Sequence, residues 1–133
     1  MTNIELIQIS TYKNNGQRAE QNFRYTVTGL IEKADNIAHT VSGDCNGTQI
    51  KSARATICKG LDLIAYLATD AAENFAYVTA DCKTAYIMTK AEYIAFCTAF
   101  ATVTRDSEKN GGGLKMRLKS ESAAMRAWLS AKA

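Results

Sequence analysis

The chain has 133 residues, of which 47% are hydrophobic, and a formal net charge of +3. This length is typical of one domain that buries a modest core without disulfides or a structural metal, so we predict a single domain over residues 1–133. No apolar run is long enough to span a bilayer, and the N-terminus lacks the basic flank and apolar stretch of a signal peptide, which predicts a cytoplasmic protein with no membrane partner.

The four cysteines form no CxxC pair, and the single histidine, His39, is far from them in the chain. This spacing does not indicate a zinc site and predicts free thiols. Basic residues gather in two segments: residues 49–60 hold three bases and no acid, and residues 109–133 hold six bases and one acid. Such a distribution is typical either of a face that binds a polyanion or of a solvated surface.

The N-terminal half predicts a strand, a helix and a hairpin. Alternating apolar residues predict a strand over residues 4–9. Apolar residues that recur every three or four positions predict a helix from Gln17 to about Thr28, with a stripe formed by Ala19, Phe23, Val27 and Leu30. The pair Asn46-Gly47 is the strongest short hairpin signal, and it predicts a second hairpin strand that begins at Thr48 and continues to Ile57.

The C-terminal half predicts two strands, a helix, a strand and a helix. The strands cover residues 75–79 and 85–88, and Thr89-Lys90-Ala91-Glu92 then has the Thr-x-x-Glu form of a capping box that opens a helix. After the glycines at 111–113, strict alternation predicts a strand over residues 114–118, and Ser120 or Ser122 caps a final helix. This order predicts an α/β or α+β fold with one mixed sheet flanked by helices.

The hairpin tip brings together side chains that can do chemistry. If Asn46 and Gly47 form the turn, Asp44 lies opposite Gln49, and Lys51 projects on the same side of the sheet. A carboxylate and an amide supply the oxygen ligands that Mg²⁺ prefers. Lysine can orient or deprotonate an attacking water, so a phosphodiester is the natural substrate of such a group.

Two segments carry a resemblance to a known family. Residues 16–20 read Gly-Gln-Arg-Ala-Glu, and residues 43–52 read Gly-Asp-Cys-Asn-Gly-Thr-Gln-Ile-Lys-Ser. They resemble the Gly-x-x-Ala-Glu opening of the first helix and the metal-binding hairpin of the PD-(D/E)xK nucleases, the restriction-endonuclease-like group that includes Holliday-junction resolvases. The resemblance spans about residues 16–58 and implies the αβββαβ core of that family.

The resemblance also implies roles for individual residues. Glu20, Asp44 and Gln49 would hold Mg²⁺ or Mn²⁺, and Lys51 would be the motif lysine, so that all four form the catalytic site. Gln49 stands where the family usually has an acid, as in the Q-x-K variant of some methyl-directed restriction enzymes, and this leaves one negative charge fewer for the metal. Asp35 fits the family's usual interval before Gln49 better than Asp44 does, so both aspartates remain candidates.

Several polar side chains flank this group and are candidate contacts to nucleic-acid phosphates: Ser52, Arg54, Lys59 and Arg24. For each of them the alternative is an ordinary solvated strand edge or helix face. His39 is a candidate general base, with an incidental loop histidine as its alternative. Tyr12 and Tyr25 are candidates for stacking on bases, and the alternative for both is burial against the sheet.

The leading prediction is a metal-dependent DNA endonuclease of a restriction, mobile-element or phage system. Because cutting two strands needs two sites, we also expect a homodimer or higher homo-oligomer. The second prediction is a catalytically inactive nucleic-acid-binding or nuclease-blocking accessory protein on the same fold. The third is an interaction domain whose hairpin tip has no chemical role. Metal-dependent cleavage of DNA would support the first prediction, and binding of nucleic acid without cleavage would support the second. Neither cleavage nor binding would support the third.

Overall fold

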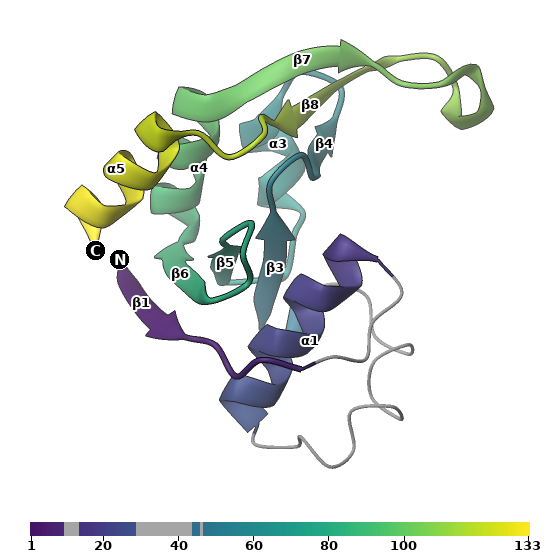
Figure 1. Cartoon of the computed structure of the whole chain (residues 1–133). Coiled ribbons are helices and arrows are strands. Elements are labelled where there is room, and N and C mark those ends of the chain that lie inside the picture. Colours follow the sequence, from purple (N-terminus) through teal and green to yellow (C-terminus); the bar gives the residue numbers. More distant parts are fainter. Residues whose placement is uncertain (10–13, 29–43, 46) are drawn as a thin grey trace.

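The computed structural model describes residues 1–9, 14–28, 44–45 and 47–133, and these form an α+β protein with two sheets (Figure 1). The strands are β1 (Thr2–Glu5), β2 (Asp44–Cys45), β3 (Thr48–Ser52), β4 (Thr56–Lys59), β5 (Asn74–Val78), β6 (Thr84–Thr89), β7 (Ala101–Arg105) and β8 (Leu114–Leu118). The described helices are α1 (Asn15–Thr28), α3 (Leu63–Ala68), α4 (Lys90–Phe100) and α5 (Ala123–Lys132), with a 3-10 turn, η2, at Glu108–Asn110. None of them is long and apolar enough to cross a membrane.

The larger sheet has five strands in the order β1-β6-β5-β3-β2. Strands β3 and β5 are parallel, and the other neighbours are antiparallel. The predicted hairpin is confirmed, since Asp44 pairs with Gln49 and Cys45 pairs with Thr48. Gly47 has a φ of +78°, the conformation that the second residue of an Asn-Gly turn requires.

The second sheet has three antiparallel strands in the order β4-β8-β7, so the prediction of one sheet is wrong. The strand predicted from Thr48 to Ile57 breaks after Ser52, where Arg54 adopts a left-handed backbone with a φ of +64°. This turn separates β3, which belongs to the first sheet, from β4, which belongs to the second. The apolar positions change phase across the break, from Ile50 to Ala53, Ala55 and Ile57, but no glycine or proline marks the turn, and the predicted strand therefore ran through it.

Two clusters of buried side chains cover the two faces of the five-stranded sheet. On one face, Ala19 and Phe23 of α1 pack with Ile50, Ala76 and Val78. The opposite face meets α3, α4 and α5 in the larger cluster, whose members include Phe75, Tyr77, Met88, Tyr93, Phe96 and Leu129. Figure 1 shows α1 on one side of β3 and the pair α4 and α5 on the far side of β5 and β6.

The predicted helix caps are confirmed. The Thr89 hydroxyl oxygen accepts a hydrogen bond from the backbone N–H of Glu92 at 3.2 Å, and the Glu92 carboxylate accepts one from the backbone N–H of Thr89 at 2.9 Å. Ser122, rather than Ser120, caps α5 by accepting from the N–H of Met125 at 3.1 Å. These local hydrogen bonds satisfy backbone donors that a helix leaves free at its first turn.

Other predictions need correction. The first strand covers Thr2–Glu5 instead of residues 4–9, because it pairs with β6 from Thr2 onward. Val27 is 46% exposed and lies outside the apolar stripe expected of α1. Helix α3 and strand β7 were not predicted, the latter because α4 passes into it at Ala101 without a turn residue between them.

Candidate active site

The backbone register aligns the three hairpin positions expected to act together. Gln49 and Lys51 lie beside Phe75 and Tyr77 of the parallel neighbour β5, and both aromatic side chains belong to the larger core cluster. Since laterally paired residues project to the same face of a sheet, Gln49 and Lys51 share the face opposite α1. Asp44 occupies the register position directly across from Gln49.

Lys51 is the half-buried cation of this group. Its ammonium donates to the backbone carbonyl of Thr56 at 3.4 Å. Burial lowers the pKa of Lys51 below its ordinary value, because desolvation disfavours the charged form. The negative charges of Asp70 and then Glu20 act in the opposite direction on this pKa, so both carboxylates lie within electrostatic reach of the ammonium.

Glu20 reaches this group differently from the expected arrangement. Its helix, α1, packs on the opposite face of the sheet, where Ala19 and Phe23 contact the smaller core cluster. Strand β2 pairs only with Thr48 and Gln49, so beyond Gln49 the described structure places no strand along that edge of β3. Glu20 thus lies with α1 on one face of the sheet, and Lys51 projects on the other. The charge of Glu20 still raises the pKa of Lys51.

Asp70 is a carboxylate near Lys51 that the sequence did not single out. It follows α3, and its Oδ1 accepts a hydrogen bond from the N–H of Ala72 at 2.9 Å. Its backbone carbonyl accepts another from the ammonium of Lys90 at 3.1 Å. These two contacts hold the loop before β5 in place. No local signal predicts the proximity, because it depends on the parallel pairing of β3 with β5.

The donors available for a metal ion near Lys51 are oxygen atoms. Asp44, Gln49, Glu20 and Asp70 supply carboxylate and amide oxygens, which suit Mg²⁺ or Mn²⁺ better than Zn²⁺. Among the described residues, however, no three His, Cys, Asp or Glu side chains are grouped as metal ligands. A cation here would therefore depend on water and substrate phosphate oxygens for most of its coordination, as Mg²⁺ often does.

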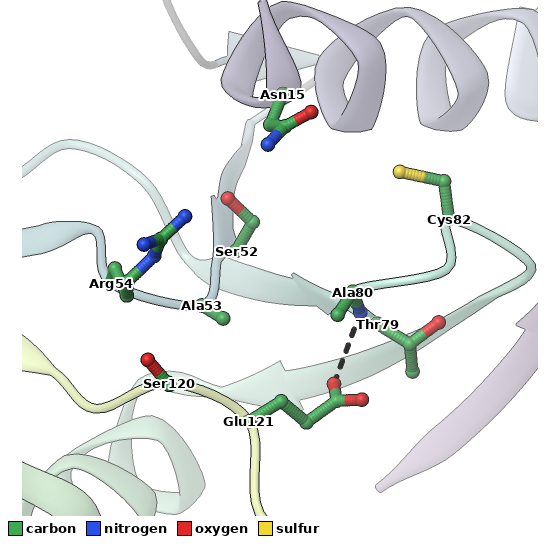
Figure 2. A pocket seen from close by; sticks show the side chains of 9 residues that line it. All are labelled: Asn15, Ser52, Ala53, Arg54, Thr79, Ala80, Cys82, Ser120 and Glu121. Atoms are coloured by element: carbon green, nitrogen blue, oxygen red, sulfur yellow. Dashed lines mark hydrogen bonds between the residues drawn. The ribbon is translucent and has the colours of Figure 1, made fainter.

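The predicted phosphate contacts fall in three places. Ser52 and Arg54 line a hollow of about 340 Å³ at the end of β3, next to Asn15 and Glu121 (Figure 2). Lys59 is exposed, but it lies at the far end of β4 in the second sheet. Arg24 is only 4% exposed, and this burial contradicts its prediction as a phosphate contact.

Four further residues were candidates for base stacking, metal binding or general-base catalysis. One of them is buried, and three lie outside the described part of the chain. Tyr25 is fully buried at 0% exposure, which contradicts stacking on bases. Asp35, His39 and Tyr12 lie outside the described residues.

Three of the four cysteines, Cys58, Cys82 and Cys97, are free and buried. Burial raises the pKa of the Cys97 thiol to about 12, although the Tyr93 hydroxyl and the Lys51 charge oppose this shift. A thiol with so high a pKa holds little of the nucleophilic thiolate near neutral pH. These three residues therefore act as core side chains, in agreement with the spacing of cysteines along the chain.

Comparison of the chain with protein-family models, with curated proteins and with solved structures found no match. The resemblance to the PD-(D/E)xK nucleases thus rests on the residues at 16–20 and 43–52 themselves.

Proposed function

We propose that this protein is a DNA endonuclease of the PD-(D/E)xK kind, with Lys51 as the residue that acts on the attacking water. One observation carries the proposal: a lysine with a lowered pKa projects beside Gln49, whose partner across the hairpin is Asp44, with two further carboxylates in electrostatic reach. Groups whose pKa is shifted by burial and by specific charges concentrate at functional sites. An ordinary surface lysine on a strand has no such environment.

The chemistry follows from the protonation of Lys51. A lowered pKa increases the fraction of neutral amine near neutral pH, and a neutral amine can accept a proton from water. As the water oxygen bonds to phosphorus and its proton moves to Nζ of Lys51, the P–O bond to the leaving oxygen breaks, and that oxygen takes a proton from solvent water. The resulting ammonium then lies beside a phosphate whose negative charge it stabilises.

Asp44 and Gln49 of the hairpin are the residues that we propose to hold Mg²⁺ or Mn²⁺, and Glu20, expected as a third ligand, acts on Lys51 through its charge from the other face of the sheet. When bound, such an ion supplies Lewis-acid stabilisation of the phosphate oxygens. Within this chain, the Asp44 position contributes the one carboxylate of the hairpin, and Gln49 contributes a neutral amide. A neutral ligand weakens cation binding relative to a second carboxylate, so we expect weaker metal binding than at a site with two carboxylates.

The decisive experiment is cleavage of supercoiled plasmid and of oligonucleotide duplexes with Mg²⁺, with Mn²⁺ or with a chelator. We expect metal-dependent cleavage that falls about 10²- to 10⁴-fold in Lys51→Ala, the usual loss for a general base. Asp44→Ala should also lose activity. Lys83→Ala is the matched control, because Lys83 is an exposed lysine in the turn between β5 and β6. Cleavage that survives both Lys51→Ala and Asp44→Ala would remove the proposed site.

Two further features belong to this proposal. Since a double-strand cut needs two sites, we propose a homodimer or higher homo-oligomer, which light scattering on the purified protein tests. The free thiols at Cys58, Cys82 and Cys97 support a reducing, cytoplasmic setting. A restriction, mobile-element or phage system is the proposed biological context.

A second candidate function keeps nucleic-acid binding and loses the chemistry. It is favoured by the amide of Gln49 at the usual acid position and by the lack of a three-ligand group among the described residues. An accessory protein of this kind would bind nucleic acid in the presence of a chelator. It would cleave no substrate with any of the metals, and Gln49→Glu would then be expected to restore metal affinity.

A further inference from the structure

The hollow at the end of β3 is lined by polar side chains from separate parts of the chain. Asn15 begins α1, Ser52 ends β3, Arg54 lies in the turn that follows, and Ser120 precedes α5. Figure 2 shows the side chains of Asn15 and Ser52 directed toward the same space. Within the described structure, none of these four side chains hydrogen-bonds another residue. The hollow therefore offers hydrogen-bond donors and one positive charge that no described protein group uses.

Glu121 is the one carboxylate in the lining, and its charge is compensated. Its Oε1 accepts hydrogen bonds from the Tyr77 hydroxyl at 2.7 Å and from the Ala80 N–H at 3.1 Å, the latter shown as a dashed line in Figure 2. Its Oε2 pairs with the Arg126 guanidinium at 3.3 Å. The carboxylate thus serves to hold the loop, and an anion in the hollow would meet Arg54 as the uncompensated charge.

Arg54 has a strained backbone that its neighbours hold in place. Its φ of +64° is a conformation that side-chain-bearing residues adopt at a cost. The Arg54 N–H donates to the Lys119 carbonyl at 3.3 Å, and the Arg117 guanidinium donates twice to the Arg54 carbonyl, at 3.1 and 2.8 Å. Strain of this kind persists where surrounding contacts impose it, and it concentrates at functional sites. The same contacts place Arg117 beside Arg54.

A second hollow of about 340 Å³ lies on the other side of Arg54. Its lining contains Arg54 again, together with Arg117, Thr102 and Thr104 on the outward face of the second sheet. The two guanidinium groups are the donors of this second hollow, because the Thr102 hydroxyl donates to the Arg117 carbonyl at 3.5 Å and the hydroxyl oxygen of Thr104 is buried. Two adjoining hollows that share one arginine fit an extended polyanion better than a single small anion.

We propose that the two hollows receive successive phosphates of one DNA strand, with the Arg54 guanidinium between them. This inference rests on the proposed function, because it takes DNA as the bound polyanion and places it at the end of the strand that carries Lys51. Guanidinium groups bind phosphate through strong, charge-assisted hydrogen bonds, and hydroxyl and amide donors commonly add contacts to the backbone. Such contacts position the strand without reading its sequence.

The test is binding of a fluorescently labelled DNA duplex to the full chain in chelator, measured by anisotropy over a series of NaCl concentrations. Arg54→Ala should weaken binding about tenfold and reduce the slope of log K against log salt by about one. Arg54→Gly should lose binding equally while melting no lower than the wild type, because glycine adopts a positive φ without strain. Arg105→Ala, at an exposed arginine on the far end of β7, should bind like the wild type.

Binding by Arg54→Ala and Arg54→Gly within about twofold of the wild type would overturn the inference, as would an equal loss in Arg105→Ala or no binding by the wild type. The outcome is separable from that of the cleavage assay. If binding depends on Arg54 and no metal supports cleavage, the proposed hydrolysis fails and the strand path stands. If cleavage depends on Lys51 while DNA binding does not change on substitution of Arg54, the proposed hydrolysis stands and the proposed strand path fails.

Discussion

The two sheets differ in how far they remove their side chains from water. In the five-stranded sheet, β5 is buried at four of its five positions, because α1 covers one face and α3, α4 and α5 cover the other. In the three-stranded sheet, no residue of β7 is buried, and Arg117, Thr102 and Thr104 lie on a face that none of the described helices covers. Lys51 in the first sheet is therefore desolvated and its pKa is lowered, whereas Lys59 at the end of β4 in the second sheet remains exposed to water.

The largest expected effect comes from truncating one apolar side chain near each sheet, because the loss of stability reports how deeply that side chain is buried. Phe96 of α4 is fully buried against the five-stranded sheet, and its ring lies 5.2 Å from that of Tyr77. We expect Phe96→Ala to lower the free energy of unfolding by about 3–5 kcal/mol, because the cavity cannot close completely. Urea denaturation followed by circular dichroism measures this loss.

Val103→Ala is the matched change on the second sheet. Val103 is 55% exposed in β7, so its truncation should change the free energy of unfolding by no more than about 0.5 kcal/mol. A loss of several kcal/mol at Val103 would mean that the second sheet is covered in solution, and the contrast between the sheets would fail.

Replacement of Lys51 tests whether the first sheet desolvates a charge. Lys51→Met should raise the free energy of unfolding by about 1 kcal/mol at neutral pH, since a buried charge is replaced by an apolar side chain of similar length. Below the native pKa of Lys51 both folded and unfolded chains carry the proton, and the cost of burying it is complete. Between that pKa and the ordinary value of 10.5 only the unfolded chain retains the proton, so wild-type stability rises with pH.

The advantage of Lys51→Met should therefore be largest at low pH and disappear as the pH approaches 10.5. Thermal melts of both proteins across this range measure it. Lys59→Met is the control on the second sheet, where an exposed lysine should give a difference that does not depend on pH in this way. Equal pH profiles for the two substitutions would contradict the desolvation of Lys51.

A smaller effect is expected from substitution of Asp70, which alters the pKa of Lys51 and leaves the residues of the hairpin unchanged. Removal of its negative charge in Asp70→Asn should lower the pKa of Lys51 further, because the carboxylate raises it in the wild type. If Lys51 is the general base, cleavage then reaches its plateau at a lower pH than in the wild type. A pH profile that moves upward instead would exclude this assignment for Lys51.

Local signals were enough to predict the parts of the site that lie within one turn of the chain. Asn46-Gly47 determined the hairpin and with it the pairing of Asp44 with Gln49, because this dipeptide accepts the backbone conformation of the turn. Thr89 and Glu92 determined the start of α4 in the same way, through reciprocal hydrogen bonds. Each of these features depends on neighbours fewer than six residues apart.

Only the tertiary structure decided which strands pair with each other and which residues surround Lys51. No glycine or proline interrupts the residues from Thr48 to Ile57, which predicted one strand, yet Arg54 turns the chain and β4 pairs with β8, more than fifty residues away. The proximity of Asp70 and Lys51 arises because β3 and β5 lie parallel, and the hollows around Arg54 arise because two sheets meet there. Sequence by itself determined the short-range turns, caps and alternation, since their energies are local, whereas sheet membership and the surroundings of Lys51 follow from long-range packing.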